Sequence, residues 1–414
     1  MTDWSPQQDA ALREVAAWLA TPSAPQVFYL AGFAGSGKST LARHLAADAG
    51  DVEFAAFTGK AAYVMRQKGC PHAGTIHQLI YHPNGDSNAS IRSAQRALDE
   101  HDLSDPGEGK RSHGWSQRKE MLEADLAFAQ RQRKVPSFRL NPDSRLRHVD
   151  LLVVDECSMV GSRIGEDVES YGTRILVLGD PAQLPPVGDG GYWTNRTPDV
   201  MLTEVHRQAA ESSILRLATK VRQGGEISVA DRGGDLRILF SQNRDEIAVL
   251  AQAVDQIIVG RNRTRHLVNA RMRQLAGISD PFPIPGDKVI CLRNDHKAGL
   301  LNGSLWRVHN ATPPVGDILM MQISSEEDAD DVNHVIDSHS CHFLGDDAAA
   351  ARLGFARKSA QEFAYGYAIT CHKAQGSQWS SVLGFDEGYT FKEDAQRWRY
   401  TMITRAADEL TVVI

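Results

Sequence analysis

The chain has 414 residues, of which 42% are hydrophobic and 23% are charged, and at about 150 residues per domain this length predicts two or three domains with sizeable cores. This length excludes a small disulfide-stapled scaffold, and a charged fraction near the roughly 25% of ordinary globular proteins argues against global disorder. The formal charge of −7, from 45 basic and 52 acidic side chains, argues at first against a nucleic-acid partner, because phosphates bind Lys and Arg.

The N-terminus and the cysteines predict a cytoplasmic protein with no membrane partner. The first eight residues lack a basic stretch followed by an apolar core, and no run of about 18 apolar residues occurs in the sequence. The five cysteines are odd in number and are never spaced as C-x-x-C. This pattern is typical of reduced thiols and argues against a disulfide framework or a zinc ribbon.

Short β-branched and apolar runs, with helical patterns between many of them, predict an α/β fold. Each run is bounded by Gly, Pro or Asp, as buried parallel strands are. Some 200 residues separate two groups of these runs, so we expect two α/β cores. The predicted strands are 27–30, 54–57, 151–154, 175–178, 381–385 and 410–414.

Two stretches interrupt this alternation and look inserted. Residues 81–148 are polar and have no strand pattern, with a patterned helix near 117–134; their part from 110 to 147 has ten Lys or Arg and four acids, a charge of +6. Residues 283–360 begin with short strands at 286–292 and 305–308, which predict a small β barrel. Between 326 and 347 this second stretch has eight acids and no Lys or Arg.

A phosphate-binding loop follows the first predicted strand. Residues 32–40 fit G-x-x-x-x-G-K-[ST] between a strand and a helix. In this motif the glycines let backbone N–H groups surround a polyphosphate, and the helix N-terminus adds the positive end of its dipole. Lys38 is expected to contact the β- and γ-phosphates of ATP, and Ser39 to ligate Mg²⁺. The predicted cofactors are ATP and Mg²⁺, and the predicted loop residues are Gly32, Gly35, Ser36, Gly37, Lys38, Ser39 and Thr40.

Two carboxylates and an amide follow later strands. Asp155 comes directly after the strand at 151–154, where a carboxylate beside the loop can hold Mg²⁺ together with Ser39. Glu156 is the predicted general base that takes a proton from the attacking water. Gln183, in a turn after the strand at 175–178, is predicted to face the γ-phosphate; taken alone, this turn is equally compatible with an ordinary Pro-rich surface loop.

With these motifs in this order, the chain resembles the superfamily 1 helicases of the RecD-like and Dda-like branch, from residue 4 to the last residue. Residues 155–160, Asp-Glu-Cys-Ser-Met-Val, are similar to the D-E-x-S-M of that branch, with Cys157 where Ala is usual. Gln378 departs from a commonly acidic position. The other segments that resemble family motifs are 5–11, 57–62, 74–77, 202–208, 367–378 and 400–406.

The resemblance implies two RecA-like P-loop NTPase cores with two insertions. The first, ATP-binding core is expected at residues 1–80 and 149–205, and the second at 206–282 and 361–414. Residues 81–148 would be a helical wedge, or pin, and residues 283–360 an SH3-like β barrel. Basic residues of the wedge, such as Arg131 and Arg133, would guide DNA strands, although a solvated helical face explains them equally well.

The resemblance also implies roles for individual residues. Gln8 would read adenine, Gly376 and Gln378 would contact the nucleotide, and Arg207 and Arg405 would reach the γ-phosphate from the second core. With Lys38, Asp155, Glu156 and Gln183, these two arginines form the predicted catalytic set. Single-stranded DNA would be contacted by Thr58, Lys60, Thr75, His77, Thr370 and His372, whose donors suit phosphates without reading bases. Taken alone, each of these six residues is as compatible with a helix cap or a core position as with a DNA contact.

The sequence therefore predicts a monomeric, ATP-dependent DNA helicase. Family analogy implies 5′-to-3′ movement on single-stranded DNA, junctions of single- and double-stranded DNA as partners, and work with replication, repair or recombination proteins. The charge of −7 does not exclude this, because the chain is +1 without the eight acids between 326 and 347.

Two rival functions remain open at this level. An RNA remodelling helicase is compatible with the motifs, since phosphate contacts do not distinguish RNA from DNA unless a 2′-hydroxyl is read. A nucleotide-switched ATPase adaptor would hydrolyse ATP without moving along a strand.

Overall fold

The computed structural model describes most of the chain in two compact units. One unit contains Met1–Ile76 and Arg145–Ile414, and the other is His77–Ser144. The described residues are 4–47, 49–83, 87–104, 113–132, 138–186, 191–204, 212–295, 298–326, 333–354, 357 and 359–414, without the side chains of 39, 83, 87–93, 113–114, 127–132 and 138.

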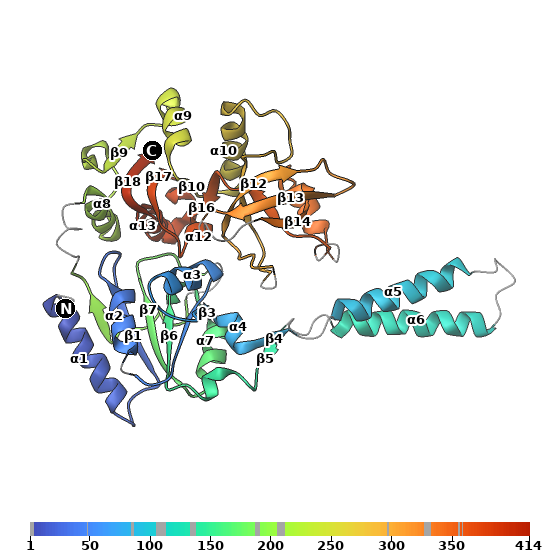
Figure 1. Ribbon diagram of the computed structural model, residues 1–414, viewed down its shortest axis with the longest axis horizontal. Helices are drawn as coiled ribbons and strands as arrows, with labels where there is room; N and C mark the ends of the chain where they lie inside the picture. The colour runs from blue at the N-terminus through green and yellow to red at the C-terminus, as the bar shows by residue number, and fades with distance from the viewer. Residues whose placement is uncertain are drawn as a thin grey trace. The chain divides into compact units, whose positions relative to one another are not determined.

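The first sheet of the larger unit has six parallel strands in the order β3-β2-β6-β7-β1-β8 (Figure 1). Every residue of β1 and β6 is buried, as in parallel strands that helices cover on both faces. The strands and helices of this first α/β domain are β1 Val27–Gly32, β2 Val52–Ala56, β3 Gly74–Thr75, β6 Leu151–Asp155, β7 Arg174–Gly179, β8 Val200–Leu202, α1 Pro6–Ala20, α2 Lys38–Ala46, α3 Gly59–Gln67, α4 Ile76–Ile80, which continues into the smaller unit, and α7 Ser162–Glu169.

The second sheet has five parallel strands in the order β16-β10-β17-β18-β9. Its core contains the fully buried Trp398 and the apolar residues of β10 and β18. The elements of this second α/β domain are β9 Leu236–Leu239, β10 Gln256–Val259, β16 Ala368–Thr370, β17 Trp379–Phe385, β18 Ala406–Val413, α8 Ser213–Arg222, α9 Arg244–Ala253, α10 Asn262–Leu275, α12 Cys371–Ala374 and α13 Ala395–Ile403.

The predicted α/β alternation is confirmed, and all six predicted strands are strands of these two parallel sheets. The structure adds β3, β8, β9, β10 and β16, which have two to four residues each. Such short strands carry too few residues for a period to be read from the sequence.

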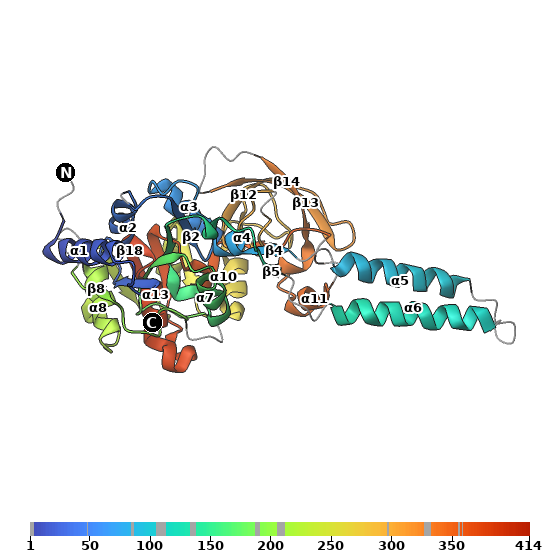
Figure 2. The same cartoon turned by 90° about the horizontal axis from the view of Figure 1, so that it is seen from below.

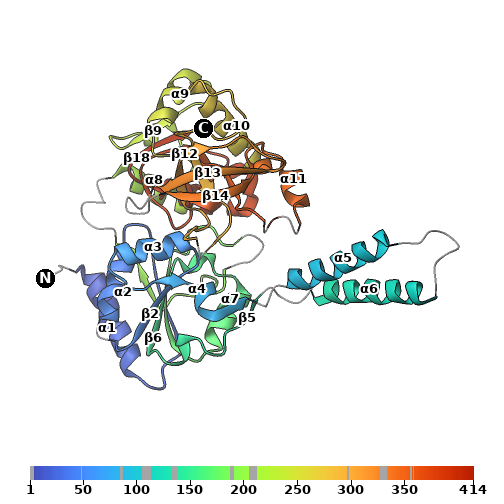
Figure 3. The same ribbon diagram turned by 45° about the vertical axis from the view of Figure 1, so that its right-hand side comes forward.

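The third sheet is antiparallel, in the order β14-β13-β12-β11-β15, and β12, β13 and β14 lie side by side in Figure 3. The predicted strands at 286–292 and 305–308 are confirmed as β11 and β12. The elements here are β11 Lys288–Cys291, β12 Leu305–Ala311, β13 Ile318–Ser325, β14 His334–His339, β15 Phe363–Tyr365 and the short α11 Asp347–Arg352.

Glu326, the first residue of the acidic stretch, belongs to a charge cluster on this sheet. Its carboxylate lies 3.1 Å from the Lys288 ammonium and pairs with Arg307. Burial lowers the pKa of Lys288, and this effect outweighs the opposing effect of the Glu326 charge. Residues 327–332, which hold four further acids, lie outside the described part of the chain.

The smaller unit is a helical hairpin on a two-stranded ribbon. Strand β4 (Tyr81–Pro83) pairs antiparallel with β5 (Phe138–Leu140), and α5 (Ser87–Leu103) and α6 (His113–Gln132) lie side by side (Figures 1 and 2). The predicted helix is confirmed as α6. The stretch also contains the two strands of the ribbon, although it has no strand pattern. These two segments lie more than 50 residues apart and pair over three residues each, too few to leave a strand period. None of the described helices of the chain is long and apolar enough to cross a membrane.

A buried ion pair joins helix α10 to the antiparallel sheet. Arg273 donates from Nε and Nη2 to the two oxygens of Asp287, each at 3.1 Å, and the two residues are 5% and 0% exposed. The hydroxyl of Tyr367 donates to the same carboxylate at 2.7 Å. Because Asp287 is fully buried, loss of the guanidinium would leave an uncompensated charge in the interior.

We expect Arg273→Ala to lower the free energy of unfolding by about 3–5 kcal/mol, the usual cost of removing one partner of a buried pair. Arg271→Ala is the matched control, because Arg271 is an exposed arginine on the same helix and should change the stability by no more than about 0.5 kcal/mol. Urea denaturation followed by circular dichroism measures both. Equal, small effects would show that the ion pair contributes nothing.

Candidate active site

The phosphate loop connects β1 to α2 and is built on glycine conformations. Gly35 and Gly37 have φ of 78° and 80°, in the left-handed region, and Gly37 is the N-cap residue of α2. Gly32 has no room for a side chain, since an added Cβ would lie 2.5 Å from Ser36 Oγ and 2.9 Å from Leu202 Cβ. The loop therefore has the close-packed, glycine-dependent turn that the motif predicts.

Lys38, the first residue of α2, lies over the loop. Its ammonium donates to the carbonyl oxygens of Gly32 at 2.6 Å and Phe33 at 3.1 Å. Thr40 borders the adjacent cavity, and the side chain of Ser39 lies outside the described part of the structure.

Gln8 supports the loop from the side of α1. Its Nε2 donates to the Ser36 carbonyl oxygen at 3.0 Å, and its Oε1 accepts from the Ser5 N–H at 3.0 Å in a capping box. The side chain is 3% exposed and does not border the cavity. The predicted contact between Gln8 and adenine stays a prediction.

The two predicted acidic residues lie where β6 ends. Asp155 is 9% exposed, and its Oδ1 accepts from the Glu156 N–H at 2.8 Å. Glu156 has φ 54° and ψ 43°, a left-handed conformation that costs of order 1 kcal/mol for a residue with a side chain. Burial and then the charge of Asp155 raise the pKa of Glu156, while Arg405 and Lys38 lower it. Both cations therefore lie close enough to act on this carboxylate.

Gln183 follows β7 in a loop that Asp180 organises. Its backbone N–H donates to the Asp180 carbonyl oxygen at 3.1 Å, and the Asp180 carboxylate accepts from the Ala182 N–H at 3.0 Å. The Gln183 side chain is 7% exposed and borders the cavity.

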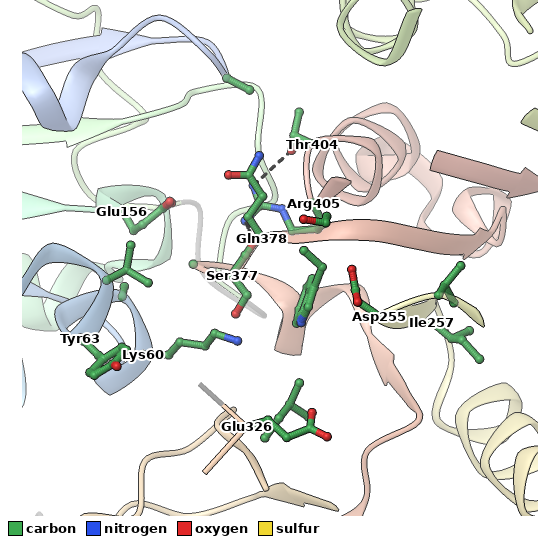
Figure 4. A pocket seen from close by; sticks show the side chains of 18 of the residues that line it. Lys60, Tyr63, Glu156, Asp255, Ile257, Glu326, Ser377, Gln378, Thr404 and Arg405 are labelled. Carbon is green, nitrogen blue, oxygen red and sulfur yellow. Dashed lines mark hydrogen bonds between the residues drawn. The ribbon is translucent and has the colours of Figure 1, made fainter. Parts of the chain in front are cut away.

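Arg405 approaches this site from the second α/β domain. It is 5% exposed and donates from its three guanidinium nitrogens to the oxygens of its neighbours: Nε to Thr401 O at 3.1 Å, Nη1 to Ser377 O at 2.9 Å and Nη2 to Thr404 Oγ1 at 3.1 Å. Figure 4 shows Arg405, Thr404, Ser377, Gln378 and Glu156 around the cavity. Arg207, the other predicted arginine, lies outside the described residues.

A single cavity of about 1510 Å³ brings most of the predicted nucleotide and catalytic residues together. Its walls also include Lys60, whose side chain extends into it in Figure 4. Gly32 and Gln8 lie outside the lining. The predicted site residues along its walls are Gly35, Ser36, Gly37, Lys38, Thr40, Lys60, Asp155, Glu156, Gln183, Gly376, Gln378 and Arg405.

Three buried polar atoms on this cavity's residues test whether a nucleotide fits. Ser36 Oγ, Gln183 Oε1 and Ser377 Oγ are buried without a hydrogen-bond partner among the described residues. Buried polar atoms are seldom left unsatisfied, so each is a candidate contact for a ligand or its water. With the loop geometry and Lys38, they fit a polyphosphate, and Asp155 supplies the carboxylate that Mg²⁺ prefers.

The predicted strand-contacting residues of the first α/β domain are mostly engaged locally. Thr58 caps α3 by accepting from the Ala61 N–H at 3.1 Å, and Thr75 is buried in β3. Lys60 is 7% exposed, and its ammonium lies 4.7 Å from the ring centroid of Trp379 in the second α/β domain. Only Lys60 of these three borders the cavity.

The other predicted strand contacts lie elsewhere. Thr370 is the N-cap residue of α12, and His372 is half-buried with its ring 5.7 Å from that of Phe391, where burial lowers the His372 pKa. His77 belongs to the smaller unit, where its ring lies 5.6 Å from that of Tyr81. The Arg131 side chain and all of Arg133 lie outside the described part.

Several residues of the site were not identified from the sequence. Tyr400 contacts the phosphate loop and Asp180, Trp379 contacts Lys60, and Ser377 accepts from Arg405. Tyr400 and Ser377 lie inside motifs that the resemblance covers, and Trp379 directly follows one. Their partners, however, are 28 to 366 positions away or on another domain, and no pattern in the sequence reports such contacts.

Two family models match the chain. One, described as an AAA domain, matches residues 3–238, and the other, described as a UvrD-like helicase C-terminal domain, matches residues 365–413. Among curated proteins, the ATP-dependent RecD2 DNA helicase of Deinococcus radiodurans is 27% identical over 286 residues, which are 63% of this chain and 35% of that protein. The chain thus spans about a third of the length of this relative.

Solved helicase structures share the fold. The structure of Bacteroides Pif1 bound to single-stranded DNA matches with a TM-score of 0.52 and 15% identity, covering 100% of this chain and 92% of that one. A structure of two coordinating Pif1 helicases at forked double-stranded DNA matches with a TM-score of 0.52 and 16% identity, covering 99% and 92%. At these identities the likeness is one of fold: parallel sheets in a two-domain, RecA-like arrangement.

We expect Gly32→Ala to weaken binding of a fluorescent ATP analogue by about tenfold or more, because the Leu202 Cβ cannot yield without a shift of β8. Gly234→Ala is the matched control, since an added Cβ there meets no heavy atom within 4 Å. Fluorescence titration with Mg²⁺ present measures both affinities, and thermal melting checks that both variants fold. Unchanged affinity in Gly32→Ala would contradict the close-packed loop.

Proposed function

We propose that the chain, which belongs to the AAA-domain family and whose motifs resemble the superfamily 1 helicases of the RecD-like and Dda-like branch, is an ATP-dependent DNA helicase moving 5′-to-3′ on single-stranded DNA. Its similarity to RecD2 and its fold, shared with Pif1 helicases, support this proposal. One observation carries this proposal. The phosphate loop and acidic pair of one parallel-sheet domain and Arg405 of the other border the same cavity. ATP hydrolysis in such a site changes the contact between two domains, which is what translocation requires.

The chain's own residues divide the chemistry among them. The loop amides and Lys38 would bind the polyphosphate, and Ser39 and Asp155 would hold Mg²⁺, which would screen the phosphate charge. Glu156 accepts the proton of the attacking water, a task that its raised pKa favours. Gln183 orients that water or senses the γ-phosphate.

The remaining nucleotide contacts come from both domains. Arg405 stabilises the charge that develops on the phosphates, as an arginine finger does, and Arg207 joins it. Gly376 and Gln378 border the cavity beside Ser377, where they would contact the nucleotide. Gln8 would read adenine after leaving its contact with the Ser36 carbonyl oxygen.

The domain organisation follows the same proposal. The ATP-binding core is residues 1–80 and 149–205, and the second core is 206–282 and 361–414. Four strands of the antiparallel sheet lie in residues 283–360 and support an SH3-like role for them, and the fifth, β15, follows directly at Phe363–Tyr365. The helical hairpin in residues 81–148 would act as the wedge that separates the strands, with basic residues such as Arg131 and Arg133 guiding them.

The proposed nucleic acid is DNA, and the proposed active form is a monomer. The relatives support DNA, since RecD2 is described as a DNA helicase and the Pif1 structures contain single-stranded or forked DNA. Thr58, Lys60 and Thr75 on one core, with Thr370 and His372 on the other, would alternately hold its phosphates. His77 would add a contact, and work in replication, repair or recombination would follow from junction unwinding.

A strand-displacement assay with 5′- and 3′-tailed duplexes tests the proposal. We expect unwinding of the 5′-tailed DNA duplex only, and ATP hydrolysis that single-stranded DNA stimulates more strongly than RNA of the same sequence. Stronger stimulation by RNA would favour a remodelling helicase. ATP hydrolysis that is indifferent to nucleic acid, with no displacement, would favour a nucleotide-switched adaptor.

We expect Glu156→Gln to reduce turnover by about 10²–10⁴, the usual contribution of a general base, and to leave ATP binding intact. In the wild type, kcat should fall with acid at a pH above the ordinary glutamate pKa of about 4.3. The reason is that burial and Asp155 raise the pKa of Glu156, and a protonated carboxyl cannot accept a proton.

Steady-state hydrolysis with excess single-stranded DNA, measured across pH 4–9, checks both expectations. Glu166→Gln is the control, because Glu166 is exposed on α7 of the same domain. Full activity in Glu156→Gln, or an acid limb at the ordinary pKa, would remove the base assignment.

A further inference from the structure

The hydroxyl of Tyr400 lies between two groups of the first α/β domain, although Tyr400 belongs to α13 of the second. It accepts from the Ala34 N–H of the phosphate loop at 3.1 Å and donates to Asp180 Oδ2 at 2.6 Å. Tyr400 is 2% exposed and Asp180 1% exposed. A single buried phenol therefore connects the phosphate loop, the loop after β7 and the opposite domain.

The contact with Asp180 is strong for a phenol. A hydrogen bond to an ionised carboxylate in a buried place is about twice as strong as a neutral one, and Asp180 Oδ1 is already held by the Ala182 N–H. Burial and then Asp180 raise the pKa of Tyr400, so the phenol keeps its proton. The hydroxyl is thus a fixed donor to Asp180 and a fixed acceptor for Ala34.

The same stretch of chain positions Arg405. Thr401, the next residue of α13, accepts from the Leu184 N–H through Oγ1 at 2.9 Å and from Arg405 Nε through its carbonyl oxygen at 3.1 Å. Tyr400 and Thr401 therefore hold the loop from Asp180 to Leu184, while the turn after them carries the arginine that borders the cavity. A shift of Tyr400 would move Arg405 with it.

Ala34 is the point at which phosphate binding can reach this connection. It borders the cavity in the loop whose amides are expected to bind phosphate, and its N–H donates to Tyr400. A phosphate oxygen that takes up this N–H competes with a neutral phenol, and charged acceptors win such competitions. Because the phenol and the phosphate compete for the same N–H, each weakens the binding of the other by the same factor. A stronger phenol contact therefore means weaker phosphate binding.

We propose that Tyr400 is a positioning residue that couples occupancy of the phosphate loop to the placement of Arg405. With the phenol on Ala34 and Asp180, the two domains are joined and Arg405 is held by Ser377, Thr401 and Thr404. When phosphate takes the Ala34 N–H, α13 loses one of its contacts with the loop, and Arg405 is free to turn toward the cavity. The coupling rests on the proposed ATPase function, but the contact itself can be tested without hydrolysis.

The test compares Tyr400→Phe with a matched control, Tyr29→Phe. Tyr29 is also fully buried, and Asp180 acts on its pKa, but its hydroxyl has no partner among the described residues. Both variants lose one buried hydroxyl of the same kind. Hydrogen–deuterium exchange of the peptide containing residues 33–37 is followed without nucleotide and with a non-hydrolysable ATP analogue plus Mg²⁺.

We expect Tyr400→Phe to speed exchange of this peptide by about tenfold without nucleotide, the effect of losing about one charge-assisted contact, and to match the wild type with the analogue bound. Its kcat with single-stranded DNA should fall by about tenfold, because the variant also lacks the Asp180 contact that holds α13 and Arg405 in place. Its affinity for the analogue should rise by up to about tenfold, because the phosphate no longer has to displace the phenol. Tyr29→Phe should leave exchange, kcat and this affinity unchanged. Asp180→Asn keeps an acceptor for the phenol but removes the charge, so it should speed exchange less.

The outcomes separate this proposal from the proposed function. Loop exchange in nucleotide-free Tyr400→Phe that equals the wild type, or equals that of Tyr29→Phe, would overturn the contact. Equal slowing of exchange by the analogue in wild type and variant, with unchanged kcat, would make Tyr400 a structural brace only and would overturn the coupling. If the wild type hydrolyses no ATP, the proposed function fails, while the exchange experiment still decides the contact. If Tyr400→Phe does not fold, Asp180→Asn decides by the same measurement.

Discussion

The site depends on three carboxylates gathered at the ends of two neighbouring strands. Asp155 is the last residue of β6, Glu156 follows it, and Asp180 follows β7. Asp155 and Asp180 are buried, and Glu156 is half-buried. Burial and then the charges of Asp155 and Asp180 raise the pKa of Glu156, and nearby cations lower it. Lys38 and Arg405 supply the cations, and Tyr400 supplies a hydrogen bond. One of the two cations and the phenol's hydrogen bond come from the second α/β domain, so the balance is complete only when both domains are present.

The parallel sheet explains why distant residues meet there. In the order β3-β2-β6-β7-β1-β8, strands β6, β7 and β1 are adjacent and point the same way. Their carboxyl ends therefore lie at one edge, where ligands of such sheets bind. The phosphate loop after β1 and the acidic pair after β6 are separated by more than 100 residues but by only one strand. At this edge Glu156 has a left-handed backbone, a strained conformation of the kind found at functional sites.

The sequence could predict what depends on local pattern. Buried parallel strands read as apolar runs, and the phosphate loop needs its glycines at set spacings, so both were identified. The structure departs from the prediction where contacts between residues far apart in the sequence determine the local structure. Strands of two to four residues leave no period in the sequence. From composition alone Glu326 is one residue of an acidic run, but in the structure it pairs with Lys288 and Arg307. Tyr400 was covered by a motif, yet its role is set by Ala34, which is 366 positions away.

The resting state of Arg405 gives the site a requirement that its motifs do not state. To reach a phosphate, the guanidinium has to give up hydrogen bonds with Thr401, Ser377 and Thr404. Each of these bonds has a charged donor and is worth about 1.5–3 kcal/mol net, so leaving all three costs roughly 5–9 kcal/mol, more than one charge-assisted contact returns. Arg405 therefore needs two changes before it moves: the loss of the Ala34–Tyr400 contact, which loosens α13, and a further interaction between the two domains that offsets this cost. Lys60 of the first α/β domain and Trp379 of the second, 4.7 Å apart, form a contact of this kind at the edge of the same cavity.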